Sequence, residues 1–387
     1  MPHFLIPLLA FAAIVGVEFD IAPGITYGDI FCGILFAIVI AKFVRGSLKV
    51  DRISKYTLGY VLVIGISGII NGTLSSTVFL NYYRCFTEGW VVYVAVVSSI
   101  SDEKDYKVIS TFFFLFALYF IFYSRKMLVI AAVELPDIKG MVLDYGRNNW
   151  GFSCLLLIIA LSFVSFRGRL KHGMFSLLIL PALVFFVIFS ASRFAIISLA
   201  FFAIFSLYWE VGRRATLRNL LLIVILASCA YFYIFPLLET IVGSDMLSSS
   251  FSLFEDKIKR AGEDAIDLRV VELNIRPIQD AYRDNGLLQL FFGDGITVTH
   301  GILSQIFVST GVVGCVYFLI YNFKIIAAYI KRGVNGQFLS IVVLIMFLND
   351  FFTNTRFMVS RNTMLYMLIL AYVESYLCLF ETRQIQE

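Results

Sequence analysis

DLRVVELNIRPIQDAYRDNGLLQLFFGDG (residues 267–295) forms the centre of the longest polar interval in this 387-residue chain, which runs from Leu237 to His300. The interval contains 11 acidic and six basic residues, whereas the chain as a whole is 60% hydrophobic and 15% charged. The apolar sequence on both sides has the length and composition of membrane spans. The interval is therefore predicted to be a folded helical domain outside the bilayer, between two groups of spans.

Three arginines of this interval, Arg269, Arg276 and Arg283, follow one another at intervals of seven residues. Because seven residues make nearly two helical turns, the three guanidinium groups would share one face of a continuous helix. Pro277 interrupts such a helix, so we expect two helices, with Pro277 in the first turn of the second. Arg276 also stands four residues from an acid on either side, which is typical of an ion-paired, solvent-exposed face. That interpretation and a ligand-binding role for Arg276 both stay open here.

The composition excludes several classes of protein. An ordinary soluble domain is about one quarter charged, while the 40 phenylalanines and 20 tyrosines suit lipid-facing surfaces and interfacial belts. The net charge of +4 is small and no basic patch interleaved with aromatic residues occurs, so we expect no nucleic-acid partner. The six cysteines stand singly and there are three histidines, so neither a metal site nor a cofactor is predicted.

Twelve apolar segments can serve as membrane spans if short, packed helices are allowed. They lie at approximately 3–18, 28–44, 56–72, 79–100, 107–123, 149–166, 174–190, 193–209, 218–236, 301–323, 337–352 and 362–380. The first has no charged n-region and no convincing cleavage site, so we interpret it as a retained span. The predicted fold is an all-α polytopic membrane protein with about twelve transmembrane helices and one large extracytoplasmic helical loop. Residues 1–236 would hold helices 1–9, residues 237–300 the loop, and residues 301–387 helices 10–12 with a cytoplasmic tail.

The distribution of lysine and arginine predicts the orientation, because short cytoplasmic loops carry an excess of both. With the N-terminus in the cytoplasm, the inner loops and the tail hold 17 basic residues and the short outer loops hold seven. The inner set is Lys42, Arg45, Lys49, Arg52, Lys55, Lys104, Lys107, Arg167, Arg169, Lys171, Arg213, Arg214, Arg218, Lys324, Lys331, Arg332 and Arg383. The outer set is Arg125, Lys126, Lys139, Arg147, Arg193, Arg356 and Arg361. The Leu237–His300 interval is thereby expected outside the cytoplasm.

Arginine accumulates at the outer ends of the spans, where positive charge is normally sparse. Its planar fork binds carboxylate or phosphate, so several arginines just above the bilayer suit a lipid pyrophosphate. Snorkelling to lipid headgroups is the alternative for Arg356 and Arg361. It is weaker for Arg193, because the sequence SASR leaves almost no loop there. Arg84 and Glu88, four residues apart in the fourth span, could pair inside the bundle.

A set of short motifs then appears in a fixed order along the chain. An SxSR lies between two spans, a large outer loop follows after one further span, and an arginine precedes a GxG by about 17 residues. A histidine then leads into a span with a glycine-rich STGVVG run, and an Asn-containing GRNNWGF stands upstream. The motifs are Gly146–Phe152, Ser190–Arg193, Arg276, Gly293–Gly295, His300 and Gly311–Gly314. This ordered set resembles the superfamily of O-antigen polymerases and O-antigen ligases, over roughly residues 146–321. Trp150, within GRNNWGF, is expected to anchor the sixth span at the lipid interface.

The resemblance implies a metal-independent membrane glycosyltransferase with a fold similar to the GT-C type and a large periplasmic helical loop. It would act in lipopolysaccharide biosynthesis at the periplasmic face of the bacterial inner membrane. The donor would be a growing glycan on undecaprenyl pyrophosphate, and the acceptor the terminal sugar of a new lipid-linked repeat unit. A chain-length regulator protein and the lipid bilayer are the other implied partners. Glycine after His300 and proline after Arg276 depart from the ligase pattern, which favours a polymerase.

The chemistry of this transfer assigns provisional roles to residues. Negative charge grows on the leaving pyrophosphate, and without metal ligands arginines must stabilise it. The expected pyrophosphate-binding residues are Arg193 and Arg276, with Arg147 and Arg269 in support. The acceptor hydroxyl needs a proton acceptor or an orienting group. Asp280 and His300 are both candidates, and His300 has an ordinary pKa suited to that role.

Two other functions compete with polymerisation. The first is an O-antigen ligase that transfers the glycan to lipid A–core. The second belongs to a different class, a polytopic transporter or flippase of the same lipid-linked oligosaccharide. Transporters commonly show paired repeats and helix-breaking polar sites at the bilayer midplane. The sequence shows no matching halves, and Pro181 is the one proline deep within a proposed span.

Overall fold

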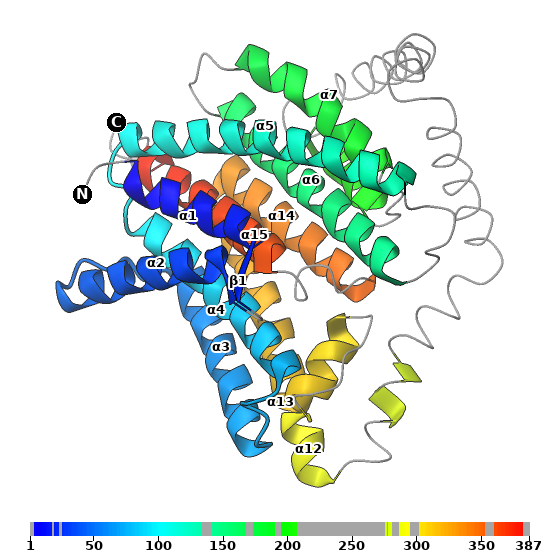
Figure 1. The fold of residues 1–387 in the computed structure, drawn as a ribbon. Coiled ribbons are helices and arrows are strands. Elements are labelled where there is room, and N and C mark those ends of the chain that lie inside the picture. Colours follow the sequence, from blue (N-terminus) through cyan, green and yellow to red (C-terminus); the bar gives the residue numbers. More distant parts are fainter. Residues whose placement is uncertain are drawn as a thin grey trace.

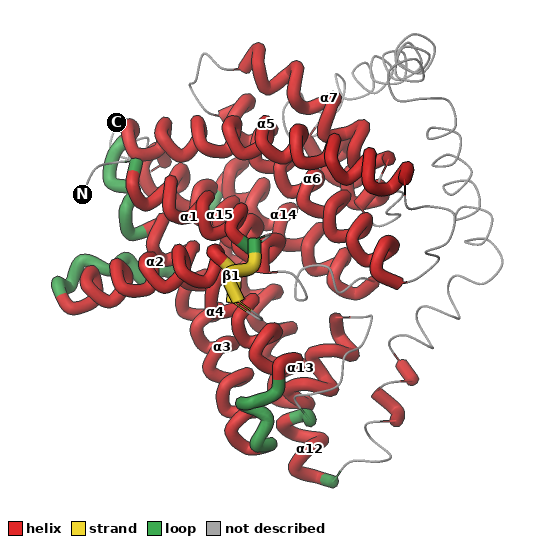
Figure 2. The backbone as a smooth tube through the Cα atoms, in the orientation of Figure 1, coloured by secondary structure: helices red, strands yellow, loops and turns green. Residues whose placement is uncertain are grey.

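The computed structural model describes part of the chain as a bundle of helices. The described residues are 4–17, 19–22, 25–133, 141–167, 173–189, 195–206, 275–276, 278–280, 286–294, 302–352 and 360–381. Within them the secondary structure is helical apart from turns and one small strand pair (Figure 2). The predicted all-α class is confirmed for this part of the chain.

The helices have the following bounds. They are α1 (Leu5–Gly16), α2 (Tyr27–Val44), α3 (Arg52–Ile70), α4 (Thr77–Val97), α5 (Glu103–Val133), α6 (Met141–Arg167), α7 (Gly173–Phe189), α12 (Leu287–Phe292), α13 (Ile302–Tyr329), α14 (Gly333–Phe352) and α15 (Ser360–Tyr376). A π-helical turn, Leu377–Glu381, continues α15. A further apolar helix covers Ala195–Ser206.

Five of the described helices are long and apolar enough to cross a membrane. These spans are Tyr27–Val44, Arg52–Ile70, Glu103–Tyr123, Ser304–Tyr329 and Ser360–Phe380. Four shorter apolar helices cover Leu5–Gly16, Asn149–Val164, Ala195–Ser206 and Asn335–Leu348. The chain is therefore a membrane protein with several apolar helices. The total of twelve remains a prediction, and the segment expected at 218–236 lies outside the described residues.

A short hairpin separates the first two helices. Strand β1 (Asp20–Ala22) pairs antiparallel with β2 (Ile25–Thr26), and this strand pair was not predicted. Its segments are too short to show the period-two pattern that marks a strand in sequence. Thr26 and Asp29 then form a capping box, in which the Thr26 hydroxyl accepts from the Asp29 backbone N–H and the Asp29 carboxylate accepts from the Thr26 N–H. This box fixes where α2 begins.

Helices α5 and α6 extend further toward each other than the predicted spans. Helix α5 continues ten residues past the expected end at 123, to Val133, and α6 begins at Met141 rather than 149. The segment MLVIAAV, which ends α5, is apolar and holds no proline or glycine, so nothing in it terminates a helix. Most of the expected outer loop is thus helical.

Helix α15 occupies the middle of the bundle, although it comes near the end of the chain. It contacts α1, α4, α5, α6 and α14 (Figure 1), and its closest association is with α4. Nearly every α15 side chain from Ser360 to Ser375 is buried. Helices α3 and α13 pack together on one flank of α4, and α6 and α7 pack together on the far side of α15. Helix α2 instead points away from the bundle in Figure 1, and its last residues are exposed.

Candidate functional site

Polar side chains collect at one end of the bundle, where α2, α4, α6 and α15 approach each other. Asp29 lies in the first turn of α2, and Ser360 is the first residue of α15. Arg84 lies in the first half of α4 and Glu88 near its middle, and Asn149 lies on α6. In the predicted orientation this is the outer end of every one of these helices. We call the group Asp29, Arg84, Glu88 and Ser360 the polar joint.

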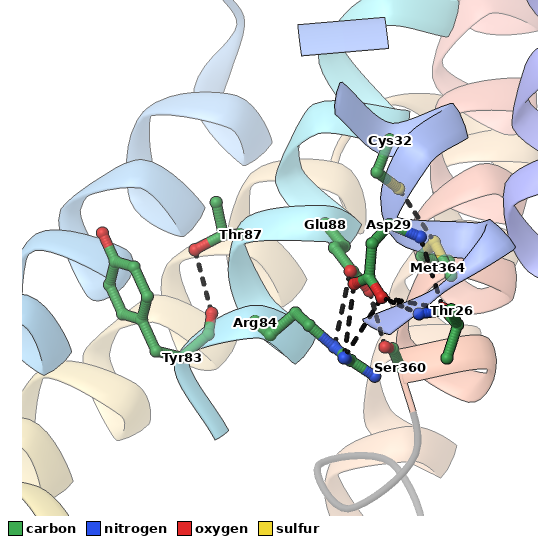
Figure 3. A network of polar contacts seen from close by, with 9 residues as sticks. All are labelled: Thr26, Asp29, Cys32, Tyr83, Arg84, Thr87, Glu88, Ser360 and Met364. Atoms are coloured by element: carbon green, nitrogen blue, oxygen red, sulfur yellow. Dashed lines mark hydrogen bonds and ion pairs between the residues drawn. The ribbon is translucent and has the colours of Figure 1, made fainter. Parts of the chain in front are cut away.

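Arg84 connects the two acids of the polar joint (Figure 3). Its Nη1 lies 3.3 Å from Asp29 Oδ1, and its Nε lies 3.5 Å from Glu88 Oε1. Ser360 donates a hydrogen bond of 2.6 Å to Glu88 Oε2. The pairing of Arg84 with Glu88 inside the bundle was expected from their spacing and is confirmed. The contacts to Asp29 and Ser360 tie α2 and α15 to α4.

A second set of polar contacts continues the layer from α15 to α6. Ser153 donates 2.6 Å to the side-chain oxygen of Asn362, and Asn362 donates 3.5 Å to that of Asn149. All three side chains are buried. Buried amides and hydroxyls are costly unless they are hydrogen-bonded, so these contacts fix the mutual position of α6 and α15. Asn149 belongs to the GRNNWGF motif, which therefore begins at this end of the bundle.

Arg361 lies beside the polar joint with its guanidinium over the Phe120 ring, 5.5 Å from the ring centroid. The side chain is buried. Snorkelling to lipid headgroups, one of the two interpretations of Arg361, is therefore wrong, because a snorkelling side chain extends outward along the bilayer. The packing on an aromatic face from α5 is a cation–π contact within the protein.

The GxG and STG motifs meet backbone to backbone. Gly293 follows α12 with φ of 74°, and Gly311 interrupts α13 with φ of 65° and ψ of −164°. A Cβ atom on Gly293 would stand 2.5 Å from the Ser309 carbonyl oxygen, and one on Gly311 would stand 2.5 Å from the Phe292 nitrogen. Glycine is required at both positions for two reasons. The φ angle is positive, and the backbone of the other segment leaves no room for a Cβ atom.

We call the contact between the Gly293 and Gly311 segments the glycine junction. Hydrogen bonds hold it against α3. The Asp294 N–H donates 2.6 Å to the Val308 carbonyl. The Ser67 hydroxyl lies between the carbonyl oxygens of Phe292 and Ser309, and Asn71 donates 3.3 Å to the Phe292 oxygen. A break in a membrane helix frees carbonyl groups that need new donors. Ser67 of α3 and the Asp294 N–H supply those donors, so the end of the large loop is held against two membrane helices.

The predicted site residues fall into three groups. Arg193, Arg269 and His300 lie outside the described residues. Arg147 lies within α6, and nothing is described of its side chain. Arg276 and Asp280 are exposed and helical in the short stretch that precedes α12, and the break expected at Pro277 lies outside the described residues. The roles assigned to these six residues remain predictions.

One expectation about the same motifs is wrong. Trp150 was placed at the lipid interface, but its side chain is buried and packs on Phe186 of α7, with ring centroids 5.4 Å apart. A tryptophan at the end of an apolar segment has the same sequence signature whether lipid or another helix covers it. The presence of α7 at this position could not be read from the motif.

Sequence reasoning missed Asp29, Ser67 and Ser360. Asp29 carried one usable signal, since Thr followed three residues later by an acid marks a capping box. Ser67 and Ser360 carried none, because a single serine in or beside an apolar segment is commonplace. No family model matches this chain, and no curated protein matches it. Among the described residues, no group of three or more His, Cys, Asp or Glu side chains is placed to hold a metal ion.

Proposed function

We propose that the protein is a polymerase of lipid-linked oligosaccharide repeat units, a membrane glycosyltransferase that acts at the outer face of the bilayer. The observation that carries the proposal is the glycine junction. Two of the motifs that resemble the O-antigen polymerase and ligase superfamily, GDG and STGVVG, are locked together, 18 residues apart from Gly293 to Gly311. An accidental match between two short motifs would give no reason for them to be in contact.

The glycine junction supports a ligand-binding site at the outer end of the bundle. It secures the C-terminal end of the large loop to α3 and α13. The segment that carries Arg276 and Asp280 is joined to this fixed point through α12. A loop held in this way can present arginines to a ligand whose headgroup lies just above the bilayer. Preorganised donors of that kind are the main source of stabilisation for charge that develops in a transition state.

The proposed transfer requires arginines that stabilise the leaving pyrophosphate and one group that accepts the acceptor proton. The oxygen of an acceptor hydroxyl attacks the anomeric carbon of the donor glycan, and the bond from that carbon to the phosphate oxygen breaks. The pyrophosphate leaves with the bonding electrons, and Arg193 and Arg276 stabilise its growing charge, with Arg147 and Arg269 in support. The acceptor proton passes to Asp280 or His300. The donor and the acceptor are both undecaprenyl-pyrophosphate-linked oligosaccharides.

A lipopolysaccharide ladder from a deletion strain tests the proposal. Loss of the long bands with a single repeat unit retained is the expected result for a polymerase. Loss of every repeat unit would contradict polymerisation and would point to a ligase or a flippase. Complementation with the wild-type chain should restore the bands and serves as the control for polar effects of the deletion.

One feature favours a second candidate, a transporter of the same lipid-linked oligosaccharide. Discontinuous helices whose freed backbone groups line a binding site are common in transporters, and α13 is broken at Gly311. The freed groups at this break are engaged by Ser67 and by the segment after α12. A flippase assay with purified protein in vesicles distinguishes the two, since a polymerase should lengthen glycans supplied on one side without moving them across.

A further inference from the structure

Helix α12, at the end of the large loop, presents large apolar side chains on its surface. Its sequence is LLQLFF, and none of its six residues is buried. Leu287, Leu288 and Phe291 are 78%, 58% and 49% exposed. Single exposed apolar residues are common on proteins, but a contiguous group of them marks a surface that meets a partner or a membrane.

The three exposed side chains share one face of the helix. At about 100° per residue, positions 287, 288 and 291 fall within an arc of about 100°, and position 289 lies on the opposite side. Gln289 is the one polar residue of α12. Its side-chain oxygen accepts a hydrogen bond of 3.3 Å from the Gly286 N–H, just before the helix begins. Helix α12 is therefore amphipathic, with its apolar face uncovered.

A helix of this length needs support from its surroundings. Isolated helices shorter than about 12–15 residues are marginal in water, and α12 has six. It contacts α13, and the glycine junction fixes its C-terminal end. The protein leaves most of the face of Leu287, Leu288 and Phe291 open, so a further stabilising contact is expected on that face.

Hydrogen bonds fix the level of α12 relative to a membrane helix. Ser67, in the last turn of α3, donates its hydroxyl to the Phe292 carbonyl, and Asn71 donates 3.3 Å to the same oxygen. The 19 residues of α3 rise about 28 Å, nearly the thickness of a hydrocarbon core of about 30 Å. The last turn of α3 therefore lies near the edge of that core. Helix α12 is about 9 Å long, and the headgroup region beyond the edge is roughly 5–8 Å deep.

An exposed apolar stripe on α3 leads to the same place. Leu62, Ile66 and Ile69 are exposed and follow one another at intervals of four and three residues, so they share a face of α3. Because α3 is long and apolar enough to cross a membrane, this stripe faces acyl chains. Helix α12 lies beside the end of α3 where the stripe finishes (Figure 1). Lipid is thus the partner that already covers the neighbouring surface.

We propose that α12 is an interfacial helix, which inserts Leu287, Leu288 and Phe291 into the lipid leaflet at the C-terminal end of α3. In the predicted orientation this is the outer leaflet. The occupant of the apolar face is ordinary bilayer lipid, at the boundary between headgroups and acyl chains, where such helices bury their apolar face by roughly 5–10 Å. The large loop accordingly returns to lipid at α12, before α13 begins, rather than lying outside the bilayer along its whole length.

Tryptophan fluorescence in vesicles tests the proposal. Leu288→Trp and Phe291→Trp each place a reporter on the apolar face, and Gln289→Trp is the matched control on the opposite side of the helix. Full-length protein is reconstituted in phosphatidylethanolamine and phosphatidylglycerol, with or without bromine on the acyl chains near the headgroup. The signal of the three native tryptophans is subtracted with the wild type. The reporters at 288 and 291 should lose fluorescence to brominated lipid and resist acrylamide in the water. The reporter at 289 should be quenched more by acrylamide and less by the lipid.

Three outcomes would overturn the proposal. Quenching at 288 and 291 by acrylamide alone would mean that the apolar face lies in water. Protection of both reporters from both quenchers would mean that protein covers the face, either another part of this chain or a second copy. Equal quenching by lipid at 288, 289 and 291 would exclude insertion of a single face.

Two independent reporters keep the test available if one variant does not fold, and Phe291→Trp exchanges one exposed aromatic side chain for another. The measurement needs no substrate, so its outcome is independent of whether the protein is a polymerase.

Discussion

Gly293 and Gly311 each pack against the backbone of the two residues that precede the other glycine. The first glycine faces the backbone of Ser309 and Thr310, and the second faces the backbone of Phe291 and Phe292. The contact is reciprocal, so neither segment can relax by moving a flexible side chain aside. The last turn before the end of the large loop and the break in α13 are thus one structural unit.

Substitution of either glycine should therefore disrupt the fold at the outer end of the bundle. Gly311→Ala and Gly293→Ala are each expected to lower the thermal midpoint strongly and to reduce the amount of protein in the membrane. Gly72→Ala is the matched control, because Gly72 has φ of 63° but no atom within 4 Å of the position that a Cβ atom would take. Gly72→Ala should lower the free energy of unfolding only by the cost of a non-glycine residue at positive φ, about 1–2 kcal/mol. Equal losses at positions 72 and 311 would show that the close approach is unimportant.

Arg193 and Arg276 are predicted to hold the donor pyrophosphate. Loss of one such donor costs roughly 3–4 kcal/mol in comparable preorganised sites, about two to three orders of magnitude in rate. Arg193→Ala and Arg276→Ala should each abolish the long bands of the ladder while the protein still accumulates in the membrane. Lysine should substitute poorly, because a point charge cannot reproduce a bidentate fork.

The controls for this prediction are Lys257→Ala and Lys259→Ala, which remove charge from the same loop and should leave the ladder unchanged. A normal ladder from Arg276→Ala at normal protein level would mean that this arginine belongs to an ion-paired surface helix. Full activity of the lysine variants would mean that positive charge near the pyrophosphate is sufficient. A specific bidentate binding site for the pyrophosphate would then not exist.

Topology can be tested with reporter fusions. A reporter active in the cytoplasm should work after Glu387 and within the segment 324–332, which includes the turn between α13 and α14. A fusion near Ser249 should need a reporter active outside the cytoplasm. The reason is the excess of 17 basic residues over seven between the two sets of loops. Cytoplasmic activity at Ser249 would invert the orientation and remove the basis of the proposed function.

Transfer is also predicted to be independent of metal ions. The sequence has three histidines and no acid or histidine cluster at ligand spacing, whereas arginines are abundant at the outer side. Polymerisation by purified protein should survive a chelator, with the length of the product measured on a gel. Complete loss that one divalent ion restores would assign the acids of the large loop to metal binding.

The sequence predicted local relationships better than distant ones. The pairing of Arg84 with Glu88 depends on a spacing of four residues along one helix, so it could be inferred before the fold was known. The contact of Glu88 with Ser360 joins residues 272 positions apart, and nothing in either neighbourhood indicates the other. For that reason the Arg84–Glu88 pair of the polar joint could be predicted from the sequence, and its contact with Ser360 could not.

Burial was the other property that sequence could not supply. Arg361 and Trp150 stand at the ends of apolar segments, where lipid headgroups are the default neighbours. Both are covered by protein, Arg361 by Phe120 and Trp150 by Phe186. The apolar pattern of a segment shows that it enters the membrane, but the faces that meet other helices depend on helices elsewhere in the chain.

The contact between α4 and α15 has a consequence for the order of synthesis. At a translation rate of about 5–20 residues per second, roughly 15–50 s pass between the emergence of Glu88 and that of Ser360. In the predicted topology, α4 stays in the bilayer during this interval without its principal partner. Arg84 and Glu88 are on adjacent turns of the same helix, so they can shield each other's polar groups from lipid while they wait. We expect nascent chains that end before α15 to keep this pair.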